Sequence, residues 1–167
     1  MQFTEFNLVS QPEAFEGLMK CCGSKKWANA VSKWRPYNDF NDLILRSEKL
    51  WFALEETDWL EAFSHHPPIG ADLSALRVRF AQSVDWATEE QGGVRNASEP
   101  VLESLAQGNE RYLKKFGYVF LICATGKSAD EMLASLNQRM ENDLEVELRL
   151  AAEEQAKITR IRLEKWL

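Results

Sequence analysis

Residues 133–167 read LASLNQRMENDLEVELRLAAEEQAKITRIRLEKWL, and this stretch decides the fold class. Its inward positions recur every three or four residues, which is the helical period. They are Leu133, Leu136, Met140, Leu144, Leu148, Ala151, Gln155 and Ile158. The spacing predicts a long C-terminal helix with one face buried.

A charged residue continues this inward stripe. One more step of four residues from Ile158 reaches Arg162, whereas Arg160 points well away from the stripe. A long cation on a buried face either extends along its aliphatic stem to solvent or meets an anion. The sequence leaves both alternatives open.

Most of the remaining chain is also predicted to be helical. Ser10 to Glu13 and Ser128 to Glu131 have the pattern of a capping box, which marks a helix N-terminus. Residues 40–63 and 73–90 carry apolar side chains at helical spacing. We therefore expect an all-α fold, with residues 1–167 forming a single compact multi-helix domain.

One segment does not fit a helix. Tyr118 to Ala124 is a continuous apolar run bounded by Gly117 and Gly126. Its composition alone would fit a buried strand, but no pairing partner is evident elsewhere in the chain. We expect a buried, irregular connection. Its main-chain N–H groups need partners, and a bound ligand is one possible partner.

Composition excludes several classes of function. The chain has 167 residues, of which 45% are hydrophobic, and a net charge of −6, which argues against nucleic acid or an anionic membrane surface as the partner. No apolar run approaches the ~20 residues needed to span a bilayer. The N-terminus lacks the pattern of a signal peptide, and the three cysteines form no disulfide or zinc pattern. We expect a cytoplasmic protein without a metal site.

The only two histidines are adjacent, at His65 and His66, and the motif His66-Pro67-Pro68-Ile69-Gly70 follows an apolar helical stretch. Pro67 disfavours helical geometry at His66 and places its imidazole on a stiff turn. The motif fits a titratable site residue, but from the motif alone a histidine that only ends a helix is the commoner interpretation.

A second polar motif is Glu89-Glu90-Gln91-Gly92-Gly93. A charged helix end followed by glycine is its simplest interpretation. Glutamate near a helix C-terminus is, however, unfavourable to the helix dipole, so a functional role remains open.

Taken in chain order, the motifs resemble one family, that of 2-oxo-4-hydroxy-4-carboxy-5-ureidoimidazoline (OHCU) decarboxylases. The N-terminal part contributes Phe6-Asn7, Phe15, Leu18, Cys22, Ser24, Trp27 and Arg35-Pro36-Tyr37. The remaining matches are Phe63, His66 to Gly70, Glu90 to Gly93, Asn109, Tyr112, Lys115 to Tyr118, Leu121 to Ala124, Lys157-Ile158 and Arg162-Leu163.

The resemblance implies an all-α homodimer that uses no cofactor and performs the last step from urate to (S)-allantoin. Its catalytic residues would be His66 and Glu90. Its substrate-binding residues would be Pro67, Gln91, Phe120, Leu121, Ile122, Cys123, Ala124 and Arg162. One position departs from the family, which often has serine where this chain has Ala87; one polar contact is therefore in doubt.

Two other classes of function remain open. A metal hydrolase built on His65 and His66 would need further ligands at suitable spacing, and none is evident in the sequence. A non-catalytic helical interaction protein fits the composition equally well. It would leave the inward Arg162 and the histidine turn without a purpose.

Overall fold

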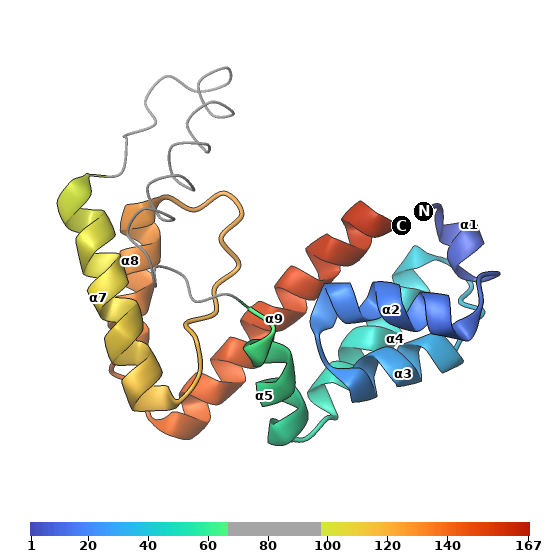
Figure 1. The fold of residues 1–167 in the computed structure, drawn as a ribbon, viewed down its shortest axis with the longest axis horizontal. Coiled ribbons are helices and arrows are strands. Elements are labelled where there is room, and N and C mark those ends of the chain that lie inside the picture. Colours follow the sequence, from blue (N-terminus) through green and yellow to red (C-terminus); the bar gives the residue numbers. More distant parts are fainter. Residues whose placement is uncertain (67–97) are drawn as a thin grey trace, which may run out of the picture. The chain divides into compact units, whose positions relative to one another are not determined.

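A computed structural model describes residues 1–66 and 98–167, and within these residues it contains eight α-helices and no strand (Figure 1). The helices are α1 (Phe3–Phe6), α2 (Gln11–Cys22), α3 (Lys25–Lys33), α4 (Phe40–Phe52), α5 (Glu56–Ser64), α7 (Glu99–Phe116), α8 (Ala129–Arg139) and α9 (Leu144–Trp166). The predicted all-α class is confirmed, and residues 40–63 form two helices.

Contacts group the chain into two compact units. The first unit comprises Met1–His66 and Leu148–Leu167, and the second comprises Pro67–Glu147. Helix α9 begins in the second unit and continues through the first. That residues 1–167 form a single domain stays a prediction.

The first unit contains three buried tryptophans whose indole N–H groups are satisfied by main-chain carbonyls. Trp27 donates to the Ser47 carbonyl, Trp51 to that of Ala152 and Trp59 to that of Trp51, each at 2.9 Å. A buried indole needs such a partner to avoid an unpaired polar group. The bond from Trp51 ties α4 to α9.

A tight corner joins α2 to α3. Gly23 ends α2 with φ +89°, a left-handed conformation that glycine adopts without strain. A Cβ atom on Gly23 would lie 3.0 Å from Cβ of His65, so this corner packs directly against the turn that follows α5. Ser24 then caps α3 by accepting a hydrogen bond from the Trp27 N–H at 3.3 Å.

The end of α9 is anchored to the N-terminal part of the chain. A Cβ atom on Gly17 would lie 2.1 Å from the Trp166 ring, so only glycine admits this ring beside α2. The amino group of Met1 donates to the Trp166 carbonyl at 2.9 Å, and the two termini meet in Figure 1. These contacts fix the rotation of α9 within the first unit.

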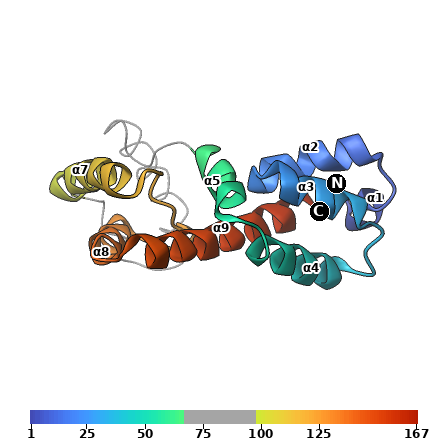
Figure 2. The same ribbon diagram turned by 90° about the horizontal axis from the view of Figure 1, so that it is seen from below.

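In the second unit, α7 and α8 lie side by side (Figures 1 and 2). A Cβ atom on Gly108 would lie 2.5 Å from a methyl carbon of Leu136, so the glycine allows close approach. The core of this unit consists of Leu102, Leu105, Tyr112, Phe116, Phe120, Ile122, Ala129, Met132 and Leu136. Ser128 and Glu131 form the predicted capping box at the start of α8.

The structure confirms a long C-terminal helix, α9, but corrects the residue at which it begins. The stripe from Leu133 to Ile158 is interrupted, because α8 ends at Arg139 and α9 begins at Leu144. Asp143 accepts a hydrogen bond from the Val146 N–H at 2.9 Å and so starts a new helix. The connection happens to preserve the spacing of three and four residues, and spacing alone could not reveal the break.

Tyr118 to Ala124 forms the irregular connection that the sequence predicts, since none of these residues is helical or extended in a sheet. Phe120, Leu121 and Ile122 are buried. The predicted helix at 73–90 and the predicted site residues Pro67, Glu90 and Gln91 lie outside the described residues. Among the described helices, none has the length and apolar character to cross a membrane.

Candidate active site

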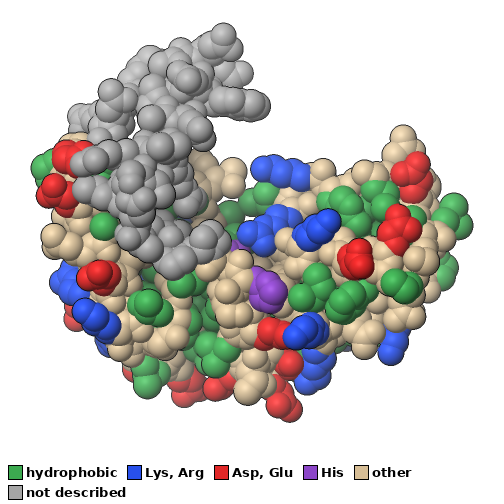
Figure 3. Space-filling view, in the orientation of Figure 1, with side chains coloured by type: hydrophobic (Ala, Val, Ile, Leu, Met, Phe, Trp, Pro, Cys, Tyr) green, Lys and Arg blue, Asp and Glu red, His purple; other side chains and the backbone are tan. Residues whose placement is uncertain are grey.

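The turn after α5 places the histidine pair. His65 ends α5, and its N–H donates to the Ala62 carbonyl at 3.2 Å, while the His66 N–H donates to that of Phe63 at 3.1 Å. His65 is exposed and His66 is half-buried. Histidine side chains reach the molecular surface in Figure 3.

His66 has a specific partner on α9. Its Nε2 lies 2.6 Å from Oε1 of Gln155, whose side chain is fully buried. Burial lowers the pKa of His66 from its ordinary value of 6.5; the hydrogen bond with Gln155 raises it in part, and the charges of Arg162 and His65 lower it further. The imidazole can therefore give up a proton readily near neutral pH.

Gln155 is itself held in place. Its Nε2 donates to Oγ1 of Thr159 at 3.0 Å, one turn further along α9. The Thr159 hydroxyl and the Ser24 N–H are hydrogen-bonded to the sulfur of Cys22, at the end of α2. Burial raises the pKa of Cys22 to about 12, so this thiol stays protonated. The sequence indicated that Gln155 faces inward but assigned it and Thr159 no role.

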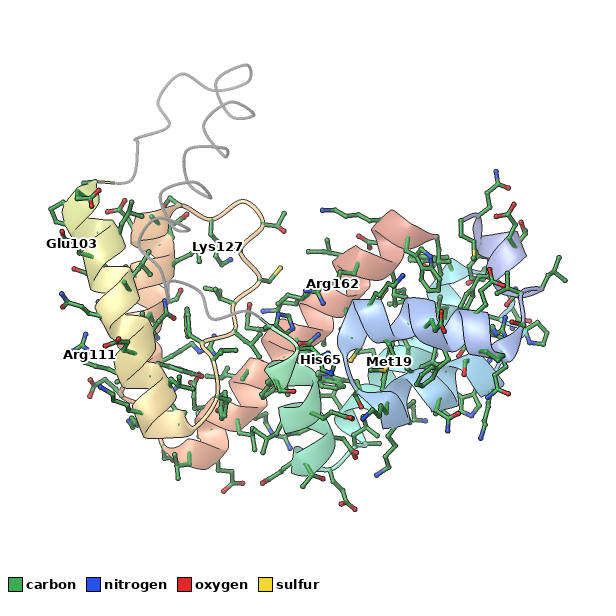
Figure 4. All side chains as sticks on the ribbon, in the orientation of Figure 1. Met19, His65, Glu103, Arg111, Lys127 and Arg162 are labelled. Carbon is green, nitrogen blue, oxygen red and sulfur yellow. The ribbon has the colours of Figure 1, made fainter. Side chains whose placement is uncertain are left out.

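Arg162 lies beside the same cluster. Its Nη1 donates to the carbonyls of Cys21 at 3.1 Å and Lys20 at 3.4 Å, at the C-terminal end of α2 (Figure 4). A cation is favourable there because the helix dipole leaves negative charge on the last carbonyls. Within the described part of the chain, Arg162 pairs with no carboxylate.

The neighbouring arginine confirms the predicted rotation of α9. Arg160 is exposed and donates to Glu164 at 3.0 Å on the solvent side. Arg162 instead reaches main-chain carbonyls of α2 and is partly buried. The sequence correctly predicted which of the two cations turns inward.

The irregular segment belongs to the second unit. The carbonyl of Leu121 accepts a hydrogen bond from Nη1 of Arg139 at 2.7 Å, and the Arg139 guanidinium lies 4.7 Å from the centre of the Phe120 ring. The N–H groups of Phe120, Leu121 and Ile122 make no main-chain hydrogen bond to other described residues. Cys123 and Ala124 are half-buried.

A buried ion pair supports this segment, and sequence reasoning missed it. Glu147 is fully buried; one of its carboxylate oxygens accepts from Nε of Arg139 at 2.8 Å and lies 2.6 Å from Nη2, which makes a charge contact rather than an aligned hydrogen bond. Tyr112 donates to the same oxygen, and Asn142 donates to the other at 2.9 Å. The signal available was a glutamate at an inward helical position.

Burial alone would lower the pKa of Arg139, but its contacts with Glu147 and Tyr112 raise it. Burial, reinforced by the bond to Glu147, raises the pKa of Tyr112. Both groups therefore keep their protons at any ordinary pH. This cluster stabilises the fold and does not exchange protons.

The structure thus places His66 and Arg162 near each other in the first unit. Gln155 and Thr159 of α9 connect His66, after α5, to Cys22 at the end of α2. Phe120 to Ala124 lie in the second unit. No group of three or more His, Cys, Asp or Glu side chains that could hold a metal ion occurs among residues 1–66 and 98–167.

The described helices define an all-helical protein in which a half-buried histidine is hydrogen-bonded to a buried glutamine. The chain belongs to the OHCU decarboxylase family, whose sequence model matches residues 7–164. The predicted family is confirmed, and with it the all-α fold.

Individual relatives agree. The chain is 41% identical over 147 residues to "Uric acid degradation bifunctional protein TTL" of Arabidopsis thaliana, a match covering 87% of this chain and 44% of that protein. It is 25% identical to "Uric acid degradation bifunctional protein" of Bacillus sp. (strain TB-90), covering 98% of this chain and 32% of the relative. The chain therefore spans less than half the length of these two relatives.

Solved structures give the same result. A crystal structure of OHCU decarboxylase in the presence of (S)-allantoin has a TM-score of 0.71 and 41% identity, covering 88% of this chain and 94% of that one. A crystal structure of (S)-allantoin synthase has a TM-score of 0.71 at 17% identity, covering 99% of this chain and 54% of the other, and this likeness concerns the fold alone.

Proposed function

We propose that this chain catalyses the cofactor-independent decarboxylation of OHCU to (S)-allantoin, a carboxy-lyase step in urate degradation. The observation that carries the proposal is family membership over residues 7–164, together with a histidine on a proline-flanked turn beside a cation. The 41% identical structure obtained in the presence of (S)-allantoin supports the choice of product.

In this proposal, His66 handles the proton. When CO2 leaves, the bonding electron pair stays on the ring carbon, which must then take up one proton on one face only. An imidazolium held on a rigid turn can deliver that proton, and the lowered pKa of His66 eases its release. Fixed hydrogen bonds and charges stabilise the developing negative charge.

The other residues bind and orient the substrate. Arg162 offers a guanidinium to the departing carboxylate or to a carbonyl oxygen. Glu90 keeps His66 protonated or accepts from ureido N–H groups, while Gln91 offers both a donor and an acceptor. The family resemblance adds Pro67 and the segment Phe120 to Ala124 as further substrate-binding residues.

The resemblance to the family also supports a homodimer, with residues 1–167 acting as one domain. We place the chain in the cytoplasm, because the odd number and the spacing of its three cysteines give no disulfide pattern, as expected in a reducing compartment.

A direct assay tests the function. Freshly generated OHCU is added to the purified chain, and (S)-allantoin is followed by circular dichroism; faster formation of one enantiomer than in buffer is expected. An unchanged rate and a racemic product would contradict the proposal. Dialysis against a chelator should leave the rate unchanged, and activity that disappears and returns with zinc would favour a metal hydrolase instead.

A further inference from the structure

The buried face of α9 carries two polar side chains among small and apolar ones. Gln155 is 0% exposed and Thr159 is 7% exposed. The small or apolar residues Ala151, Ala152 and Leu163 on the same helix are also buried. A buried amide or hydroxyl costs stability unless its hydrogen bonds are made. Gln155 and Thr159 therefore need hydrogen-bond partners inside the fold.

These side chains form a chain of hydrogen bonds with a fixed direction. The sulfur of Cys22 accepts hydrogen bonds from the Ser24 N–H and from the Thr159 hydroxyl. The oxygen of that hydroxyl accepts from Nε2 of Gln155 at 3.0 Å. The amide nitrogen of Gln155 is thereby turned toward Thr159, and its oxygen is turned toward His66.

The direction of the chain decides which imidazole nitrogen carries a proton. Oε1 of Gln155 can only accept, and it lies 2.6 Å from Nε2 of His66. Nε2 must therefore carry hydrogen whether the ring is neutral or charged. In the neutral ring, Nδ1 is left with the lone pair.

We propose that Gln155 is a positioning residue that holds neutral His66 in its Nε2–H form, so that Nδ1 is the atom that exchanges a proton with the substrate. The inference rests on the proposed decarboxylation. As the carbon–carboxylate bond breaks and CO2 leaves, the remaining electron pair takes the proton from Nδ1 of the imidazolium. The ring returns to its neutral Nε2–H form without any change in its bond to Gln155.

Nuclear magnetic resonance reads the tautomer without reference to activity. The chain has only two histidines, so long-range 1H–15N spectra of 15N-histidine-labelled protein contain two ring systems, and His65→Asn assigns them. At a pH where both rings are neutral, His66 should show Nε2 as the protonated nitrogen and Nδ1 as the bare one. Exposed His65 should show the mixture of tautomers found in water. A protonated Nδ1 on neutral His66 would overturn the proposal.

Substitution tests the role of the amide. Gln155→Met removes the acceptor at similar volume, and we expect His66 to shift to the tautomer mixture of His65 while kcat falls about tenfold, as for loss of one oriented bond. KM should change less than twofold, because Gln155 is not expected to touch the substrate. Gln155→Glu restores an acceptor and should restore the Nε2–H form. Gln138→Met, the same change at an exposed position, should alter neither quantity.

The outcomes separate the two proposals. If Gln155→Met folds with an unchanged melting temperature and leaves both tautomer and kcat unchanged, the positioning role is wrong. If Gln155→Met unfolds, Thr159→Val tests the same amide orientation, and an unchanged His66 tautomer in that variant would overturn the role. A wild-type chain with the Nε2–H form but no decarboxylase activity would overturn the proposed function and the proton step, and leave the tautomer assignment in place.

Discussion

Two buried polar clusters in this protein differ in the charge they enclose. In the first unit, His66 is hydrogen-bonded to a neutral group, the amide of Gln155, which is bonded in turn to the hydroxyl of Thr159. In the second unit, Arg139 and Glu147 form an ion pair that Tyr112 completes. A neutral hydrogen-bond partner leaves the histidine free to gain and lose a proton, whereas the ion pair holds its protons permanently.

The difference separates a group that can act in a reaction from groups that hold backbone in place. Arg139 binds the Leu121 carbonyl and stacks on Phe120, so it supports the irregular segment. Both clusters satisfy buried polar atoms, but only the first contains a histidine, whose pKa is lowered from 6.5 chiefly by burial.

The largest effect is expected at the histidine pair. His66→Asn should lower the rate of allantoin formation by about 10²–10⁴-fold, the usual contribution of a positioned acid or base. His65→Asn should retain most of the activity, because His65 is exposed and ends a helix. The two rates are compared by circular dichroism on the same substrate preparation. Similar rates in the two variants would remove His66 from the mechanism.

Breaking the ion pair should affect stability instead. Glu147→Gln leaves the buried charge of Arg139 without its carboxylate, and we expect a loss of about 3–5 kcal/mol in the free energy of unfolding. Urea denaturation measures this value. Tyr112→Phe keeps the ion pair and removes only one hydrogen bond to the carboxylate, so it should cost less, about 1.5–3 kcal/mol. Equal losses in the two variants would mean that the ion pair contributes no more to stability than a single hydrogen bond.

Arg162 should matter for ligand binding. Arg162→Ala should weaken binding of allantoin or a carboxylated analogue by about 1.5–3 kcal/mol, roughly tenfold or more, and Glu90→Ala should do the same. Isothermal titration calorimetry gives the affinities. Arg160→Ala is the matched control, since that side chain pairs with Glu164 on the solvent side. An effect at Arg160 but not at Arg162 would exclude the proposed contact.

The smallest effect concerns pH. The pKa of His66 is lower in the folded chain than its ordinary value of 6.5, so the folded state binds fewer protons than the unfolded state as pH falls through this range. Stability should therefore be complete above pH 6.5 and decrease as the pH falls through the folded pKa. Melting temperatures between pH 7.5 and 5 should fall more for the wild type than for His66→Asn. Parallel curves would mean that His66 is not desolvated.

The sequence by itself determined the helical class, the inward rotation of Arg162, the histidine turn and the family, because each follows from local spacing or from motifs in order. It could not reveal the break between Arg139 and Leu144, since the connection preserves helical spacing. It also could not find the partners of Gln155 and Glu147. Those depend on which side chains from distant segments meet: Gln155 lies 89 residues from His66, and Glu147 lies 35 residues from Tyr112. Only tertiary packing decides such pairs, because burial makes each polar atom require a partner that local sequence does not specify.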